Sequence, residues 1–126
     1  METSDCAGRG HLNPAACRMV AEFFSVYANP TRISILCALR DGRRTVSELA
    51  EHAGVSLQNI SQHLRVMRDK GAVRTAREGH HVYCAVADPR FLEGVRLIHD
   101  ALMDGWRHGP EAVFGQHAAA AAQPEA

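Results

Sequence analysis

The 126-residue sequence lacks any run of about twenty apolar residues, the length that a membrane-spanning helix needs. Its first five residues also lack the basic start and apolar core of a secretory signal peptide. We therefore expect a cytoplasmic protein with no membrane partner. In a reducing cytoplasm, four cysteines are expected to be free thiols, sensors or ligands rather than a structural disulfide framework.

Signatures of catalysis are missing as well. The sequence contains no Gly-rich phosphate loop, and its His, Cys and acidic residues follow no recognisable catalytic spacing. An enzyme would need a nucleophile with a base and an orienting group, or a metal with an open coordination position. The sequence therefore predicts neither an enzyme nor a bound cofactor.

An excess of charge of either sign is also absent, because 14 Lys and Arg residues balance 14 Asp and Glu residues. Neutrality by itself argues against a nucleic-acid-binding protein. The distribution of charge matters more, since basic residues predominate between positions 56 and 80 and acidic residues gather in the C-terminal third. A basic face on a neutral molecule can still displace counterions from phosphates.

The clearest helix pattern lies between Ser56 and Gly71. Ser56 suits the N-cap, where its hydroxyl accepts a backbone N–H of the first turn, and Gly71 suits the left-handed position that ends a helix. Four residues form one apolar stripe at helical spacing: Leu57, Ile60, Leu64 and Met67.

The face opposite this stripe carries amides, hydroxyls and arginines, whereas an ordinary solvated face carries mostly Glu and Lys. Amides pair with adenine edges, and arginine pairs with guanine or phosphate. This composition favours a DNA recognition helix; the alternative is a solvated face. The predicted base contacts are Gln58, Asn59, Ser61 and Gln62; Arg65 and Arg68 are expected nearer the phosphates, with Ser56 completing the set at the helix start.

A second, shorter helix is predicted just before the recognition helix. Thr45 and Glu48 have the spacing of a capping box, in which each side chain bonds to the other residue's backbone N–H. Leu49, Ala50 and Ala53 would face the core. Gly54 would end this helix, and two short helices joined by a tight Gly-containing turn constitute a helix-turn-helix.

A β-hairpin is predicted after the recognition helix, from strands over residues 73–77 and 81–86 with a turn at 78–80. A hairpin in this position is a wing. Arg77 and His80 are its candidates for contacts with the minor groove or its phosphates. His80 and His81 make a poor metal chelate, because adjacent strand residues point to opposite faces.

Three further helices complete the predicted fold. Asn13-Pro14 and Asn29-Pro30 each combine a cap with a first-turn proline, and Asp88-Pro89 starts the last helix. The second of these helices should run through Arg40. The apolar stripe of the first helix consists of Cys17, Val20, Phe23, Phe24 and Tyr27. The second helix is expected to face the core with Ile33, Leu36, Cys37 and Leu39. The last helix carries an apolar face formed by Phe91, Val95, Ile98, Leu102 and Trp106.

The last helix is too apolar to lie on the surface of a small monomer, so we expect it to pack against a second copy. The predicted fold class is mainly α with a small β-hairpin, a winged helix-turn-helix that dimerises through its first and last helices. Residues 1–13 are predicted to be a flexible arm, residues 14–107 the folded domain and residues 108–126 a disordered tail rich in alanine.

This order of elements resembles the ArsR/SmtB family of winged-helix repressors. The likeness covers about residues 15–106 and is carried by residues 29–36 (NPTRISIL), the segment 45–71 and residues 78–83 (EGHHVY). The resemblance implies a homodimeric repressor that binds double-stranded operator DNA and leaves it when a small inorganic inducer binds. It does not identify the inducer.

The metal sites of this family match the sequence only in part. The arsenic-type Cys-x-Cys falls on residues 47–51, which contain no cysteine. Asp88 matches the first ligand of the zinc-type site, but Arg90 and Ala101 stand where histidines would be expected. The resemblance therefore predicts no metal site. His99, Asp104 and His108 could supply replacement ligands, and the alternative for them is a solvated helix end.

Cys37 falls where the sulfide- and redox-responsive members keep a cysteine on the second helix. Their usual partner on the last helix is missing here, which leaves Cys17, Cys6 and Cys84. Cys17 is the preferred partner, and Cys84 is expected to pack in the wing. The prediction is a repressor released by a thiol-directed signal at Cys37, either reactive sulfur or an oxidant. Three alternatives stay open: Cys37 as a small buried hydrophobe, a metal- or metalloid-responsive repressor, and a winged helix that binds only proteins.

Overall fold

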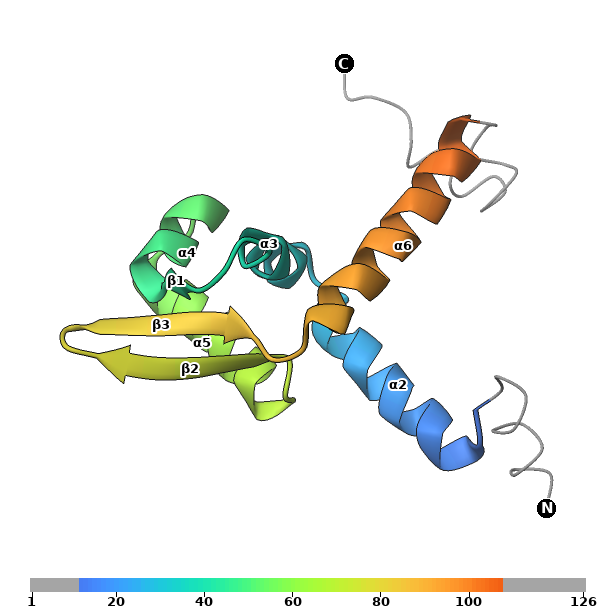
Figure 1. The fold of residues 1–126 in the computed structure, drawn as a ribbon, viewed down its shortest axis with the longest axis horizontal. Helices are drawn as coiled ribbons and strands as arrows, with labels where there is room; N and C mark the ends of the chain where they lie inside the picture. Colours follow the sequence, from blue (N-terminus) through green and yellow to red (C-terminus); the bar gives the residue numbers. More distant parts are fainter. Residues whose placement is uncertain (1–11, 108–126) are drawn as a thin grey trace. The chain divides into compact units, whose positions relative to one another are not determined.

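The computed structural model describes residues 12–107 in two compact units that divide at Pro89 (Figure 1). The predicted tail and nearly all of the predicted arm lie outside the described residues, as do Cys6 and His108. No helix within the described range is both long and apolar enough to cross a membrane. The elements are α2 (Pro14–Tyr27), α3 (Pro30–Ala38), β1 (Arg44–Thr45), α4 (Val46–Ala53), α5 (Leu57–Asp69), β2 (Val73–Glu78), β3 (His81–Val86) and α6 (Pro89–Arg107).

Side-chain caps start helices α2 and α3, as the sequence predicts. Asn13 Oδ1 accepts the backbone N–H of Ala16 at 2.8 Å, and Asn29 Oδ1 accepts that of Arg32 at 3.2 Å. A proline follows each cap, where its missing N–H costs no intrahelical bond. The end of α3 was predicted wrongly: the helix stops at Ala38, before Arg40, because the chain turns at Leu39.

The helix-turn-helix forms with the predicted caps. Thr45 and Glu48 make both bonds of the capping box, at 2.9 and 3.1 Å. Gly54 ends α4 in the left-handed region at φ 71°, which favours glycine over residues with a Cβ. Ser56 Oγ then accepts the backbone N–H of Asn59 at 3.0 Å and starts α5.

The sheet has three antiparallel strands in the order β1-β3-β2, so the predicted hairpin gains a third strand. A two-residue strand such as β1 has no alternation for a sequence pattern to reveal. The predicted turn was one residue too long, because Glu78 pairs with His81 inside the ladder. The reversal then takes only Gly79 and His80, with Gly79 at φ 64°.

The core lies among α3, α4, α5 and the sheet. Leu57, predicted to share the buried stripe of α5, is 56% exposed because it is the first residue of the helix and lies beyond the core. In α3, Ile35 is fully buried whereas Ile33 and Cys37 are only half-buried. The largest fully buried side chains are Ile35, Leu36, Leu39, Leu49, Ile60, Met67 and Cys84.

Helices α2 and α6 leave most of their apolar residues uncovered. In α2 only Val26 and Tyr27 are buried, and Phe24 from the predicted stripe is 50% exposed. No residue of α6 (Pro89–Arg107) is buried, and Ile98 is 44% exposed. These surfaces are much less covered than the apolar face of α5.

Candidate nucleic-acid interface

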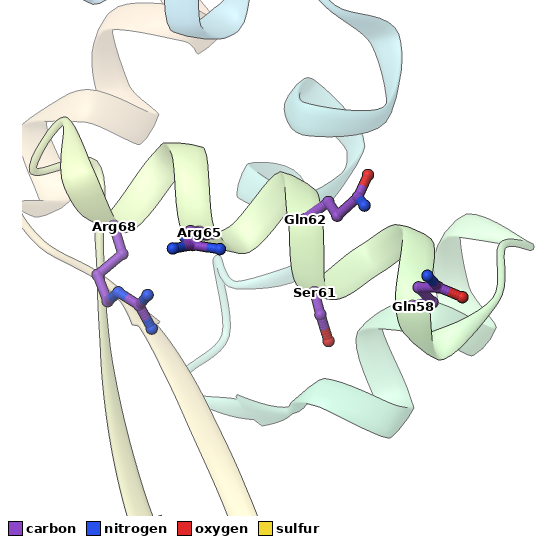
Figure 2. A pocket seen from close by; sticks show the side chains of 5 residues that line it. All are labelled: Gln58, Ser61, Gln62, Arg65 and Arg68. Carbon is purple, nitrogen blue, oxygen red and sulfur yellow. The ribbon is translucent and has the colours of Figure 1, made fainter.

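The solvent face of α5 forms an open hollow of about 410 Å³. Figure 2 shows its side chains along one helix, from Gln58 near the start to Arg68 near the end. All of them are exposed, while Ile60, Leu64 and Met67 of the same helix are buried. The hollow is lined by Gln58, Ser61, Gln62, Arg65 and Arg68.

The chemistry of this surface suits a base-paired duplex. The two glutamines offer paired donors and acceptors, which match the edge of adenine. The two arginines offer guanidinium forks for guanine or for phosphate oxygens. None of the five lining side chains is acidic, so no carboxylate within the hollow repels a phosphate.

A contact between helices fixes how α5 lies on the core. Arg32 of α3 donates through Nε to His63 Nδ1 at 3.3 Å and through Nη1 to the backbone oxygen of Val26 at 3.1 Å. One guanidinium thus joins α5 to α3 and to the end of α2. The sequence alone does not predict this role of Arg32 and His63, because no local pattern relates residues 31 positions apart.

The other predicted DNA-binding residues do not line the hollow. Ser56 and Asn59 are both exposed, and the Ser56 hydroxyl accepts the N–H of Asn59 as the helix cap. Arg77 is exposed near the end of β2, and His80 is exposed in the following turn. Their contacts with DNA stay predictions.

The wing carries a cluster that was not foreseen. Arg43 Nη1 and Nη2 donate to the two carboxylate oxygens of Glu78 at 2.7 and 3.0 Å. The Arg43 guanidinium also lies 3.8 Å from the centre of the Tyr83 ring. The hydrogen bonds and charge of Arg43 lower the pKa of the Glu78 carboxyl from its ordinary value.

The described thiols differ in exposure, and all three are free. Cys17 is exposed, and its Sγ donates to the backbone oxygen of Leu12 at 3.6 Å. Cys37 is half-buried. Cys84 is fully buried, and burial raises the pKa of its thiol to about 12, which agrees with a packing role. The pairing of Cys37 with Cys17 stays a prediction.

The weak metal candidates on α6 have other partners. His99 Nδ1 lies 3.2 Å from Asp100 Oδ1, and Asp104 pairs with Arg107 at 2.8 Å. Within residues 12–107, no three His, Cys, Asp or Glu side chains come together in a way that could hold a metal ion. His108 lies outside this range, so the predicted set is only partly described.

Sequence comparison relates the chain to known regulators. The profile of the bacterial regulatory protein arsR family matches residues 29–75, which include α3, the helix-turn-helix and the start of the wing. A probable mercury resistance operon repressor from Streptomyces lividans is 40% identical over 77 residues. That match spans 61% of this chain and 62% of the relative, less than two thirds of its length.

Solved structures that share the fold include two mycobacterial proteins. The crystal structure of Rv0081 from Mycobacterium tuberculosis superposes with a TM-score of 0.69 at 32% identity, covering 76% of this chain and 96% of that one. A homodimeric winged helix-turn-helix DNA-binding domain from Mycobacterium bovis, described as a possible ArsR-family transcriptional regulator, gives a TM-score of 0.65 at 29% identity. It covers 71% of this chain and 86% of that domain.

Proposed function

This chain belongs to the ArsR family of bacterial regulatory proteins, and we propose that it is a homodimeric transcriptional repressor that reads operator DNA through α5. The observation that carries the proposal is the solvent face of α5. It gathers two amides, one hydroxyl and two guanidiniums on a helix whose other face is held in the core. A helix anchored in this way can enter the major groove as a rigid unit.

The dimer is supported by two observations. Operators of helix-turn-helix proteins usually contain two half-sites, which a twofold dimer matches. The apolar residues of α2 and α6 are exposed in the single chain, and the similar Mycobacterium bovis domain is described as homodimeric. We propose that a second copy covers these residues.

Binding to DNA is tested with a duplex selected by the wild-type protein from a random-sequence pool. Gln62→Ala should weaken binding by about 1–3 kcal/mol and relax preference at one base position. Arg68→Ala should weaken selected and scrambled duplexes alike and reduce the salt slope by about one. Arg77→Ala should lower affinity and leave the dimer intact.

Two results would contradict this assignment. If Gln58→Ala and Gln62→Ala together leave sequence preference unchanged, α5 is not the reading helix. If the wild type binds every duplex weakly and alike, the protein-interaction alternative is favoured. An unchanged dissociation constant for Arg77→Ala at moderate salt would remove the wing from the interface.

For the effector, we propose a thiol-directed signal at Cys37, with Cys17 as the partner thiol. Both residues are free cysteines outside the fully buried core, unlike Cys84. A modification there needs to change operator binding by only about 1–3 kcal/mol to give a 5- to 150-fold loss. A sulfur chain between the two would relax the geometry that a simple disulfide requires.

A soft metal or metalloid held by the same thiols is the second candidate. Thiolates prefer soft ions, and the relative from Streptomyces lividans is described as a mercury resistance repressor. Titrating the wild type and Cys37→Ser with a persulfide, with arsenite and with mercuric ion, while following release from the selected duplex, separates the candidates. If Cys37→Ser responds to all three as the wild type does, the effector site lies elsewhere.

A further inference from the structure

The wing has a three-stranded base, where β1 pairs with β3, and a two-stranded tip next to the turn. The side chain of Arg43 connects the base to the tip. Strand β1 pairs with β3 only at Cys84 and Tyr83, so the ladder from Val82 to the turn has no third strand. Arg43 precedes β1, stacks on Tyr83 and binds Glu78, the last residue of β2. Its side chain therefore spans from the three-stranded base to the tip.

The register places the carboxylate and the predicted DNA contact on different faces of this ribbon. Glu78 pairs with His81 and Ala76 with Tyr83, so these four residues share the face that Arg43 covers. Arg77 pairs with Val82 and belongs to the opposite face. Arg43 engages both Glu78 oxygens on the side away from Arg77.

Charge explains why this matters for binding DNA. Glu78 is the acidic residue of the tip, next to Arg77 and to the turn that holds His80. A carboxylate in that position repels phosphates and competes with them for Arg77. A bidentate arginine pair both neutralises the carboxylate and fixes its direction.

We propose that Arg43 is a positioning residue of the DNA-binding wing: it holds the Glu78 carboxylate on the face opposite Arg77, so that Arg77 and His80 meet the phosphates without a competing negative charge. The inference rests on the proposed function, since it needs a wing that touches DNA. Arg43 itself makes no contact with DNA in this scheme; it acts through Glu78.

The test is a double-mutant cycle in the full chain, with affinity measured by fluorescence anisotropy on the duplex selected by the wild type. Arg43→Ala should weaken binding about fivefold, the upper range for one exposed charge pair. Glu78→Gln should bind as well as the wild type or tighter. Arg43→Ala combined with Glu78→Gln should bind within about twofold of Glu78→Gln alone, because the charge that Arg43 controls is gone.

Two outcomes would overturn the inference. If Arg43→Ala costs the same factor with Glu78 and in the Glu78→Gln background, Arg43 contacts the DNA itself or only supports the fold. If Arg43→Ala costs nothing, the carboxylate does not affect binding. Should Arg43→Ala fail to fold, as judged by thermal unfolding, Arg43→Gln keeps the cycle intact.

Arg40→Ala is the matched control. Arg40 is 71% exposed and pairs with its neighbour Asp41 at 3.7 Å, so its loss removes one positive charge without freeing Glu78. It should change affinity less than Arg43→Ala, and the change should be the same in the Glu78→Gln background. A wild type that selects no DNA sequence would remove the proposed function and this inference with it. If the wild type does select a DNA sequence but Arg43→Ala leaves its affinity unchanged, only the inference about Arg43 is contradicted.

Discussion

Helices α5 and α6 are both amphipathic, yet their apolar faces have different surroundings. In α5, Ile60 and Met67 are fully buried by other elements of the same chain. In α6, no residue is buried, and Ile98, Met103 and Trp106 are each at least 39% exposed. An apolar stripe therefore indicates that a helix needs a partner surface. The stripe alone does not indicate whether that surface belongs to the same chain or to a second copy.

The same substitution in the two helices should have different consequences, and the larger belongs to α5. Ile60→Asp places an unpaired charge in the core and should cost more than about 4 kcal/mol, a large part of the stability of a small domain. Denaturant unfolding followed by circular dichroism should show a largely unfolded protein.

Leu57→Asp is the control on the same helix, because Leu57 is 56% exposed. It should unfold within about 0.5 kcal/mol of the wild type, as surface changes usually do. Equal destabilisation by both substitutions would mean that the whole stripe of α5 is buried after all.

Ile98→Asp in α6 should dissociate the dimer and leave the winged unit, the described residues up to Pro89, folded. Burying a charge without a partner at an interface costs several kcal/mol. Sedimentation velocity should show monomers whose circular dichroism still reports a folded helical unit. Leu97→Asp, the same type of change beside the stripe, should stay mostly dimeric, and a fully dimeric Ile98→Asp protein would contradict the proposed role of α6.

Thiol labelling should separate covered from uncovered surfaces. Cys84 is fully buried, and burial raises the pKa of its thiol to about 12, which disfavours the reactive thiolate at neutral pH. Mass analysis after iodoacetamide treatment should find Cys17 modified before Cys84, and Cys84 modified only after unfolding in guanidinium. Rapid labelling of Cys84 in the folded protein would show that the sheet opens readily.

The smallest expected effect concerns the cap of α4 in the winged unit. The hydrogen bonds from Thr45 lower the pKa of Glu48 below its ordinary 4.5, so the ionised carboxylate stabilises the fold above that value. This contribution should be lost as the pH falls through the lowered pKa. The difference in Tm between the wild type and Glu48→Ala should therefore shrink in acid. Glu51→Ala on the same helix is the control, and an identical response from it would contradict a specific role for the capping box.

Local chemistry explains why much of the winged helix was predictable. A cap bonds to a backbone N–H three residues away, so Asn13, Asn29, Thr45 and Ser56 could be recognised from short segments. The face of α5 could be assigned in the same way, because a helical period places Gln58, Gln62 and Arg65 together whatever surrounds the helix.

Errors arose where burial depends on distant elements. Leu57 fits the apolar period of α5 but lies past the edge of the core. Ile35 is fully buried although it is not among the residues predicted to face the core from α3. Strand β1 was missed because its two residues are defined only by their pairing with β3. A period identifies a face of a helix, but the neighbours of that face decide how far the core extends.

The sequence by itself determined where the helices of the winged unit begin, which polar residues α5 exposes on the face opposite its core, and that the outer helices carry apolar faces. Bonds within about four residues and regular periods are enough for these conclusions. Only the tertiary structure brought Arg32 to His63 and Arg43 to Glu78, across 31 and 35 residues. Such contacts form because chain reversals bring separate segments together. The sequence pattern of one segment does not predict which residue of the other segment it will contact.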